Sequence, residues 1–166
     1  VDERIGVPFV RPLDLALTRI LEPLHIAKWT PELPQLRINK GEILVSTDGS
    51  IGDLGYVTDA WDGWAGSNNL GRIKVDPTKA HPGFVLAFLF SPYGQVQLKR
   101  GIYGGVIDHL EVTHLEGVRI PLPPLEIQAL IGERVLMAYT LRDQANALEE
   151  EAIAMVEQAI RHGSRP

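Results

Sequence analysis

Histidines and carboxylates in the second half of the chain are the first residues to consider for catalysis. His109 and His114 flank a short segment, and Asp108 precedes His109. The spacing does not place the two histidines on one face of a helix, and no third ligand is evident, so a metal site is not favoured. Asp108 and His109 could form an acid–base pair, but nothing near them supplies a nucleophile. The chain also lacks a Gly-x-Ser-x-Gly pattern, so we expect no catalytic site.

The segment GEILVSTDGSIG (residues 41–52) combines an apolar run with glycines and short polar residues. A nucleotide-binding loop would require Lys and Ser or Thr after its last glycine, whereas Asp53 and Leu54 follow here. A hairpin is favoured, because Asp48-Gly49 tolerates the positive φ of a tight turn. The polar groups at its tip could read base edges or could simply be solvated turn residues.

Two further segments combine basic residues with groups that suit nucleic acid. SNNLGRIK contains Asn68, Asn69 and Arg72, and LKRGIYGG contains Lys99, Arg100 and Tyr103. Asn pairs with adenine edges, Arg pairs with guanine edges or phosphate, and glycine lets the backbone approach a ligand closely. Most surface Lys and Arg residues only keep a protein in solution, so neither segment is diagnostic by itself.

Composition is that of an ordinary globular protein of 166 residues, with 45% hydrophobic and 22% charged residues. The absence of cysteine excludes a disulfide scaffold and a cysteine-ligated zinc site, and it is compatible with a reducing cytoplasm. No apolar run approaches the length of a membrane span. The net charge of −5 argues mildly against a stand-alone nucleic-acid binder.

The predicted secondary structure that positions these residues changes along the chain. Prolines in the first forty residues exclude a long helix there, and PLDLALTRILEPL predicts a short helix or an apolar loop. Pro82 suits the first turn of an apolar helix, and SPYGQVQLKR predicts a second short helix. Strands are predicted in LRINKGEILVS, which turns at Gly41, and in YVTDA, GRIKV and VTHLEGVRIPLPPLE, the last ended by its prolines.

A long helix is predicted from Glu126 to about Arg161. Alanine or isoleucine recurs every seven residues at Ile131, Ala138, Ala145, Ala152 and Ala159, and larger residues follow three positions later at Leu141, Leu148 and Met155. This a/d pattern indicates a helix that pairs with a partner. The alternative is an amphipathic helix that lies on its own domain.

The order of these segments resembles the DNA specificity (S) subunit of type I restriction–modification enzymes. The motifs are GVPFVRPLDL, KGEILVSTDGSIGDLGYV, HPGFVLAFLFSPYGQVQL and GIYGGVIDHLEVTHLEGVRIPLPPLEIQALI, followed by the alanine-rich helix. The resemblance implies an α+β fold, with a target recognition domain at residues 1–125 that contains a small twisted β-sheet and short helices. A long coiled-coil-type helix for spacing and dimerisation follows at residues 126–161, and residues 162–166 form a tail.

The resemblance also implies a non-catalytic, cytoplasmic subunit that binds double-stranded DNA and does not associate with a membrane. It would direct a methyltransferase subunit, which uses S-adenosylmethionine, and a restriction subunit, which uses ATP, so no cofactor is expected on this chain. We expect the DNA contacts at Arg11, Thr47, Ser50, Asn68, Asn69, Arg72, Lys99, Arg100 and Tyr103. We expect helix pairing through Ala138, Leu141, Ala145, Leu148 and Ala152.

The chain departs from that family in carrying one recognition domain and one helix where a typical S subunit has two of each. The strand expected before GVPFV is also missing or truncated. The chain is then a fragment, or a half-length subunit whose two copies would pair and read a palindromic bipartite site. Two alternatives remain open: a specificity domain cut from a fused restriction–methylation enzyme, and a protein-interaction adaptor with a dimerising helix.

Overall fold

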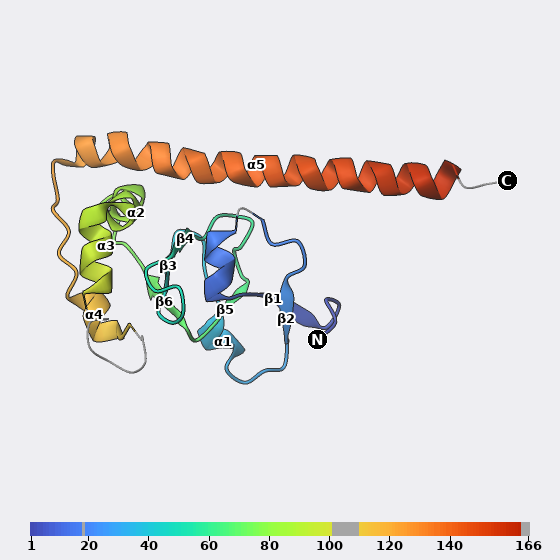
Figure 1. Ribbon diagram of the computed structural model, residues 1–166, viewed down its shortest axis with the longest axis horizontal. Coiled ribbons are helices and arrows are strands. Elements are labelled where there is room, and N and C mark those ends of the chain that lie inside the picture. The colour runs from blue at the N-terminus through green and yellow to red at the C-terminus, as the bar shows by residue number, and fades with distance from the viewer. Residues whose placement is uncertain (18, 101–109, 164–166) are drawn as a thin grey trace.

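The computed structural model describes residues 1–17, 19–100 and 110–163. Two small β-sheets and a group of short helices lie side by side beneath one long helix (Figure 1). The two sheets occupy the middle of the molecule. The short helices α2 (Pro82–Phe90), α3 (Pro92–Lys99) and α4 (Val112–Glu116) stand at the end where the long helix begins. The predicted α+β organisation is therefore confirmed.

The first sheet contains the N-terminal strand. Its order is β2-β1-β5, formed by β2 (Leu24–Ala27), β1 (Gly6–Val10) and β5 (Ala65–Gly66). β1 pairs antiparallel with β2 and parallel with β5. The 3-10 helix η1 (Pro12–Ala16) and the single-turn α1 (Leu33–Leu36) are the short helices of this region. The short helix that PLDLALTRILEPL predicted is thus η1, whereas β2 lies where no strand was predicted.

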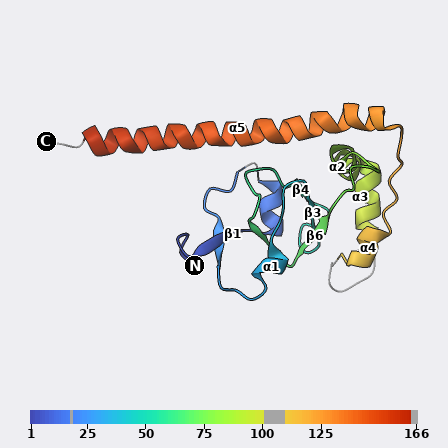
Figure 2. The same ribbon diagram turned by 180° about the vertical axis from the view of Figure 1, so that it is seen from behind.

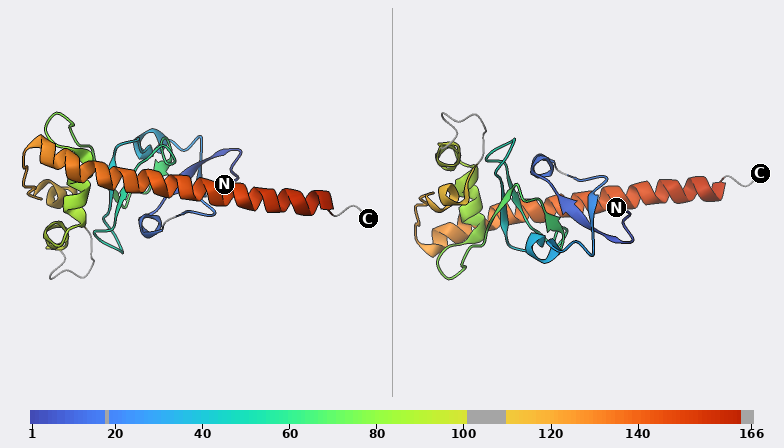
Figure 3. Two further views of the ribbon diagram at one scale, coloured as in Figure 1. Left: turned by 90° about the horizontal axis from the view of Figure 1, so that it is seen from above. Right: turned by 90° about the horizontal axis from the view of Figure 1, so that it is seen from below.

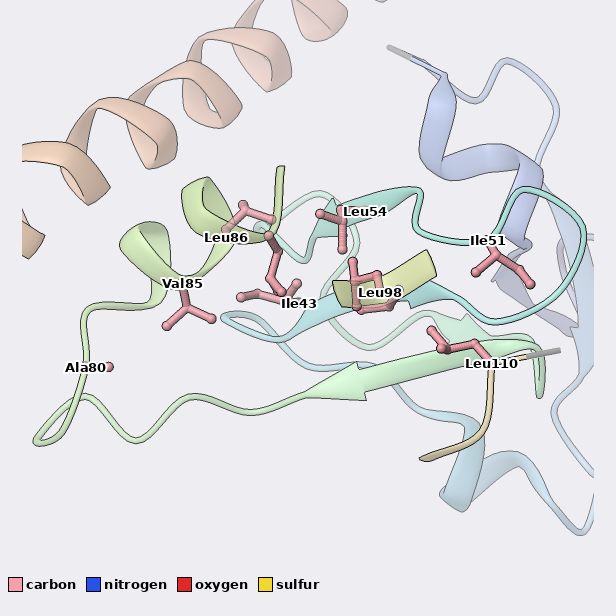
Figure 4. Packing of buried hydrophobic residues seen from close by; sticks show 10 residues of the cluster. Ile43, Ile51, Leu54, Ala80, Val85, Leu86, Leu98 and Leu110 are labelled. Atoms are coloured by element: carbon pink, nitrogen blue, oxygen red, sulfur yellow. The ribbon is translucent and has the colours of Figure 1, made fainter. Parts of the chain in front are cut away.

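The second sheet has the order β4-β3-β6, formed by β4 (Leu54–Tyr56), β3 (Ile43–Ser46) and β6 (Leu70–Ile73), and both pairings are antiparallel. All four residues of β3 are buried, as expected for an uninterrupted apolar strand covered on both faces. Ile43 and Val45 face the helices, while Leu44 faces a second cluster of buried residues. Figure 4 shows Ile43, Leu54, Leu86 and Leu98 packed together between the sheet and the helices.

Three short helices follow the sheets in the described part of the chain. Both predicted helices are confirmed, as α2 (Pro82–Phe90) and α3 (Pro92–Lys99), and each has a proline in its first turn. The strand predicted in VTHLEGVRIPLPPLE is wrong: Val112–Glu116 forms α4, and residues 117–124 are neither strand nor helix. The predicted YVTDA strand is also wrong in position, because β4 ends at Tyr56. The first arm of LRINKGEILVS forms only an isolated bridge, between Arg37 and Ala65.

The long helix α5 (Leu125–Gly163) confirms the predicted C-terminal helix. Its start is held by Gln128, which is 2% exposed. The Gln128 side-chain oxygen accepts a hydrogen bond from the His81 backbone N–H at 3.0 Å, and its amide donates to the Pro123 carbonyl at 2.7 Å. One turn later, Gly132 packs directly against Gly83 of α2. These contacts orient α5 relative to the domain.

The last third of α5, after Glu150, leaves the domain. Figures 2 and 3 show its C-terminal part extending past the sheets on the side of the N-terminus. The helix still contacts the domain where Arg19 pairs with Glu149 at 3.2 Å and Glu150 at 3.5 Å. Every residue from Glu151 to Gly163 is exposed. Part of the helix therefore projects, as its length predicted.

Candidate nucleic-acid interface

The connection between β3 and β4, residues 47–53, is the tip loop of the predicted hairpin. Gly49 and Gly52 adopt φ values of 69° and 90°, which side chains other than glycine rarely accept. The Gly52 N–H donates to the Ser46 carbonyl at 3.2 Å, and the Ser46 N–H donates to the Asp53 carbonyl at 2.8 Å. Ile51 turns inward and is 7% exposed. The loop is therefore held by its own hydrogen bonds and by one buried side chain.

A second turn, residues 67–69, lies beside the tip loop. The Thr47 N–H donates to the Asn69 carbonyl at 3.0 Å. The Asn69 side-chain amide donates to Asp48 Oδ2, also at 3.0 Å. The Ser46 hydroxyl donates to the Asp48 carbonyl at 2.9 Å. The two turns, which are about twenty residues apart in sequence, thus form one hydrogen-bonded unit.

Helix α3 also contacts the tip loop. The Gln95 side-chain amide donates to the Gly52 carbonyl and to the Leu89 carbonyl, both at 3.0 Å. Lys99 lies beside the loop, since its Cε would be 3.1 Å from a Cβ added to Gly52. We call the polar groups that these three segments bring together the tip surface, which comprises Asp48, Ser50, Asn68, Asn69 and Lys99.

The tip surface contains four of the nine residues predicted to bind DNA: Ser50, Asn68, Asn69 and Lys99. Ser50, Asn68 and Lys99 are exposed, and Asn69 is half-buried. Short hydroxyl, amide and carboxylate groups on a rigid turn can pair with base edges, and a neighbouring lysine can neutralise a phosphate. The tip surface is therefore a candidate nucleic-acid interface.

The other predicted contact residues that the structure describes are not part of the tip surface. Thr47 belongs to the same loop but is 5% exposed, so it supports the loop from inside. Arg72 is opposite Leu44 on β6, and its guanidinium donates to the Arg37 carbonyl at 2.9 Å. Arg100 lines a cavity of about 260 Å³ between α3 and α4, together with Gln97 and His114. Tyr103 and the Asp108-His109 pair lie outside the described residues.

Arg11 forms an ion pair with Asp14 inside the fold. Its Nε and Nη2 donate to the two oxygens of Asp14, at 3.0 and 2.8 Å, and its backbone N–H donates to the same carboxylate at 2.7 Å. Asp14 is 1% exposed. The hydrogen bonds to Asp14 raise the pKa of Arg11 above its ordinary value. Arg11 therefore neutralises a buried carboxylate at the start of η1.

Asp48, which belongs to the tip surface, and Gln95, which supports the tip loop, were not among the predicted DNA contacts. Asp48 was considered as a turn residue and as one of several polar groups at the hairpin tip that could read base edges. Gln95 gave no signal, because its role depends on a loop 43 residues away. Only the packing of α3 against the hairpin reveals it.

The inward and outward faces of α5 differ in character. Tyr139, on the inward face, packs edge-to-face on Tyr56 with ring centroids 5.8 Å apart, and Arg142 lies 4.8 Å above the Tyr139 ring. Burial raises the pKa of the Tyr139 hydroxyl. The five residues predicted to pair helices are all exposed on this chain: Ala138, Leu141, Ala145, Leu148 and Ala152. The predicted seam is therefore available to a partner.

The described residues form neither a metal site nor a membrane-spanning helix. Within residues 1–17, 19–100 and 110–163, no three His, Asp or Glu side chains come together in a way that could hold a metal ion. In the same part of the chain, none of the helices combines the length and the apolar character that crossing a membrane requires.

Comparison with known proteins gives a consistent result. The family model described as "Type I restriction modification DNA specificity domain" matches residues 4–158. The fold is similar to the HsdS subunit from Thermoanaerobacter tengcongensis, with a TM-score of 0.62, 20% identity and coverage of 95% of this chain and 42% of that chain. It is also similar to a chain from a type I R-M system complex, with a TM-score of 0.61, 22% identity and the same coverage. The chain thus spans less than half the length of these structures, and none of the curated proteins matches it.

Proposed function

Because the chain belongs to the family of type I restriction–modification DNA specificity domains, we propose that it recognises one half of a bipartite DNA site. The tip surface is the region that we assign to base recognition. The hydrogen bonds that join the tip loop to the turn at residues 67–69 support this assignment most directly. A reading surface must be rigid, because each flexible group loses conformational entropy when it binds.

The charge of the tip surface bears on how DNA would be bound. It presents one lysine and one aspartate, so it offers little net attraction to phosphates. Base-edge hydrogen bonds specify a sequence, whereas phosphate contacts supply most of the affinity. We infer that partner subunits make many of the contacts to DNA phosphates. These partners are the methyltransferase subunit and the restriction subunit of a type I enzyme.

In this proposal the chain itself performs no chemistry. S-adenosylmethionine and ATP would be used by the methyltransferase and restriction subunits, and the assembly would work in the cytoplasm. The exposed seam of α5 would join the recognition domain to a second helix or to a methyltransferase subunit. If two copies of this chain paired there, the site would be a palindrome with two separated halves.

The test is to co-express the chain with a type I methyltransferase subunit and a plasmid library, and then to map modified adenines by sequencing. One repeated bipartite motif is the expected result, and a palindromic motif would indicate two copies of the chain. A stable complex that methylates no motif would contradict DNA recognition and favour a docking fragment or an adaptor. The matched control is the methyltransferase subunit expressed without this chain.

A further inference from the structure

The hydrogen bond between Asp48 and Asn69 determines which way the Asn69 amide faces. Asp48 Oδ2 accepts from Asn69 Nδ2 at 3.0 Å. A carboxylate can only accept hydrogen bonds, so the amide nitrogen, and not the amide oxygen, must face Asp48. The orientation of the Asn69 side chain is thus imposed by the chemistry of its partner.

The backbone of Asn69 is held as well. Its N–H donates to the Ser67 hydroxyl at 3.2 Å, and its carbonyl accepts from the Thr47 N–H at 3.0 Å. Asp48 is held in turn, because its carbonyl accepts from the Ser46 hydroxyl. The Asn69 side chain retains one N–H and both lone pairs of its oxygen. These are the groups with which an asparagine pairs to adenine, accepting from N6 and donating to N7.

We propose that Asn69 reads an adenine in the major groove and that Asp48 is the positioning residue that orients its amide. The inference rests on the proposed function and extends it from a surface to one base pair. Asp48 places a negative charge on a surface that approaches phosphates, which weakens binding to all DNA. A role in orienting the Asn69 amide explains why an acceptor-only group stands at position 48.

Two variants distinguish a residue that orients the Asn69 amide from one that only stabilises the tip loop. Asp48→Asn keeps the side-chain size, but an amide can donate as well as accept, so the Asn69 amide is no longer held in one orientation. The double variant Asp48→Asn with Asn69→Asp restores the hydrogen bond with donor and acceptor exchanged. Position 69 then presents only acceptors, which suit the N4 amino group of cytosine.

The experiment is the methylation-motif assay, with the parent chain, both variants and the control Asp53→Asn, which removes the same charge from the other end of the loop. The parent should prefer adenine at one position by roughly 5- to 150-fold, the range typical of a bidentate contact. Asp48→Asn should lose most of that preference at that position only. The double variant should prefer cytosine there, and Asp53→Asn should retain the parent motif.

Different failures have different meanings. A parent chain that yields no motif overturns the proposed function and this inference with it. A parent motif that survives unchanged in both variants overturns the inference alone. The inference is also overturned if Asp48→Asn loses base preference equally at every position of the motif, since a merely structural residue would behave in that way. Equal melting temperatures of parent and variants show that each variant is folded.

Discussion

Gly83 of α2 and Gly132 of α5 are in direct contact, backbone against backbone. A Cβ added to Gly83 would overlap the Gly132 carbonyl, and a Cβ added to Gly132 would overlap the His81 ring. The absence of two side chains therefore lets the helices approach closely. This crossing, with Gln128 one turn earlier, determines the direction in which α5 leaves the recognition domain.

Gly132→Ala should destabilise the protein by about 1–3 kcal/mol, because the added methyl group has no space at the crossing. Thermal unfolding should show a lower Tm. Gly163→Ala is the control on the same helix, since nothing lies within 4 Å of the Cβ position there. Equal Tm values for the two variants would contradict a close helix crossing.

Arg11→Ala should lower the free energy of unfolding by about 1–3 kcal/mol, because the buried Asp14 carboxylate loses two donors. The matched control is Arg4→Ala. Arg4 makes the same side-chain contacts to Asp2, but the two side chains are 83% and 45% exposed, so the change should have almost no effect on stability. Arg11 was predicted to bind DNA, and a variant that loses DNA binding at unchanged stability would restore that role.

Lys99→Ala should weaken binding to all DNA sequences alike. A lysine that neutralises one phosphate contributes about one unit to the slope of log K against log salt concentration. Binding should be measured with the methyltransferase complex at several salt concentrations. Lys79→Ala is the control, because Lys79 is also exposed but lies beyond the far end of β6. Loss of preference at a single base would instead make Lys99 a base-reading residue.

Ala145→Glu should prevent pairing of α5 with another helix, since a charged side chain at a close-packed seam position would be buried without a partner. Sedimentation of the complex with the methyltransferase subunit should show loss of the assembled species. Gln144→Glu introduces the same group at the preceding exposed position and should leave assembly intact. If the two variants sediment like the parent, the seam lies on another face of the helix.

Local signals predicted a considerable part of this protein. Pro82 marked the start of α2, Asp48-Gly49 marked the hairpin tip, and the heptad pattern marked α5. Each signal is local, because a proline fixes its own φ, a glycine permits the positive φ of a tight turn, and a helix repeats its pattern every turn. The order of these segments was enough to identify the family.

The tertiary structure decided the roles of individual polar residues. Thr47 and Arg11 carry the same chemical groups as DNA-contacting residues, yet one is buried and the other neutralises Asp14. Segment 112–124 was wrongly predicted as a strand because nothing local shows whether an extended segment finds a neighbour to pair with. Sequence patterns reveal which groups are present, but the bond between Asp48 and Asn69 forms only because β3 and β6 pair in the sheet and bring distant turns together.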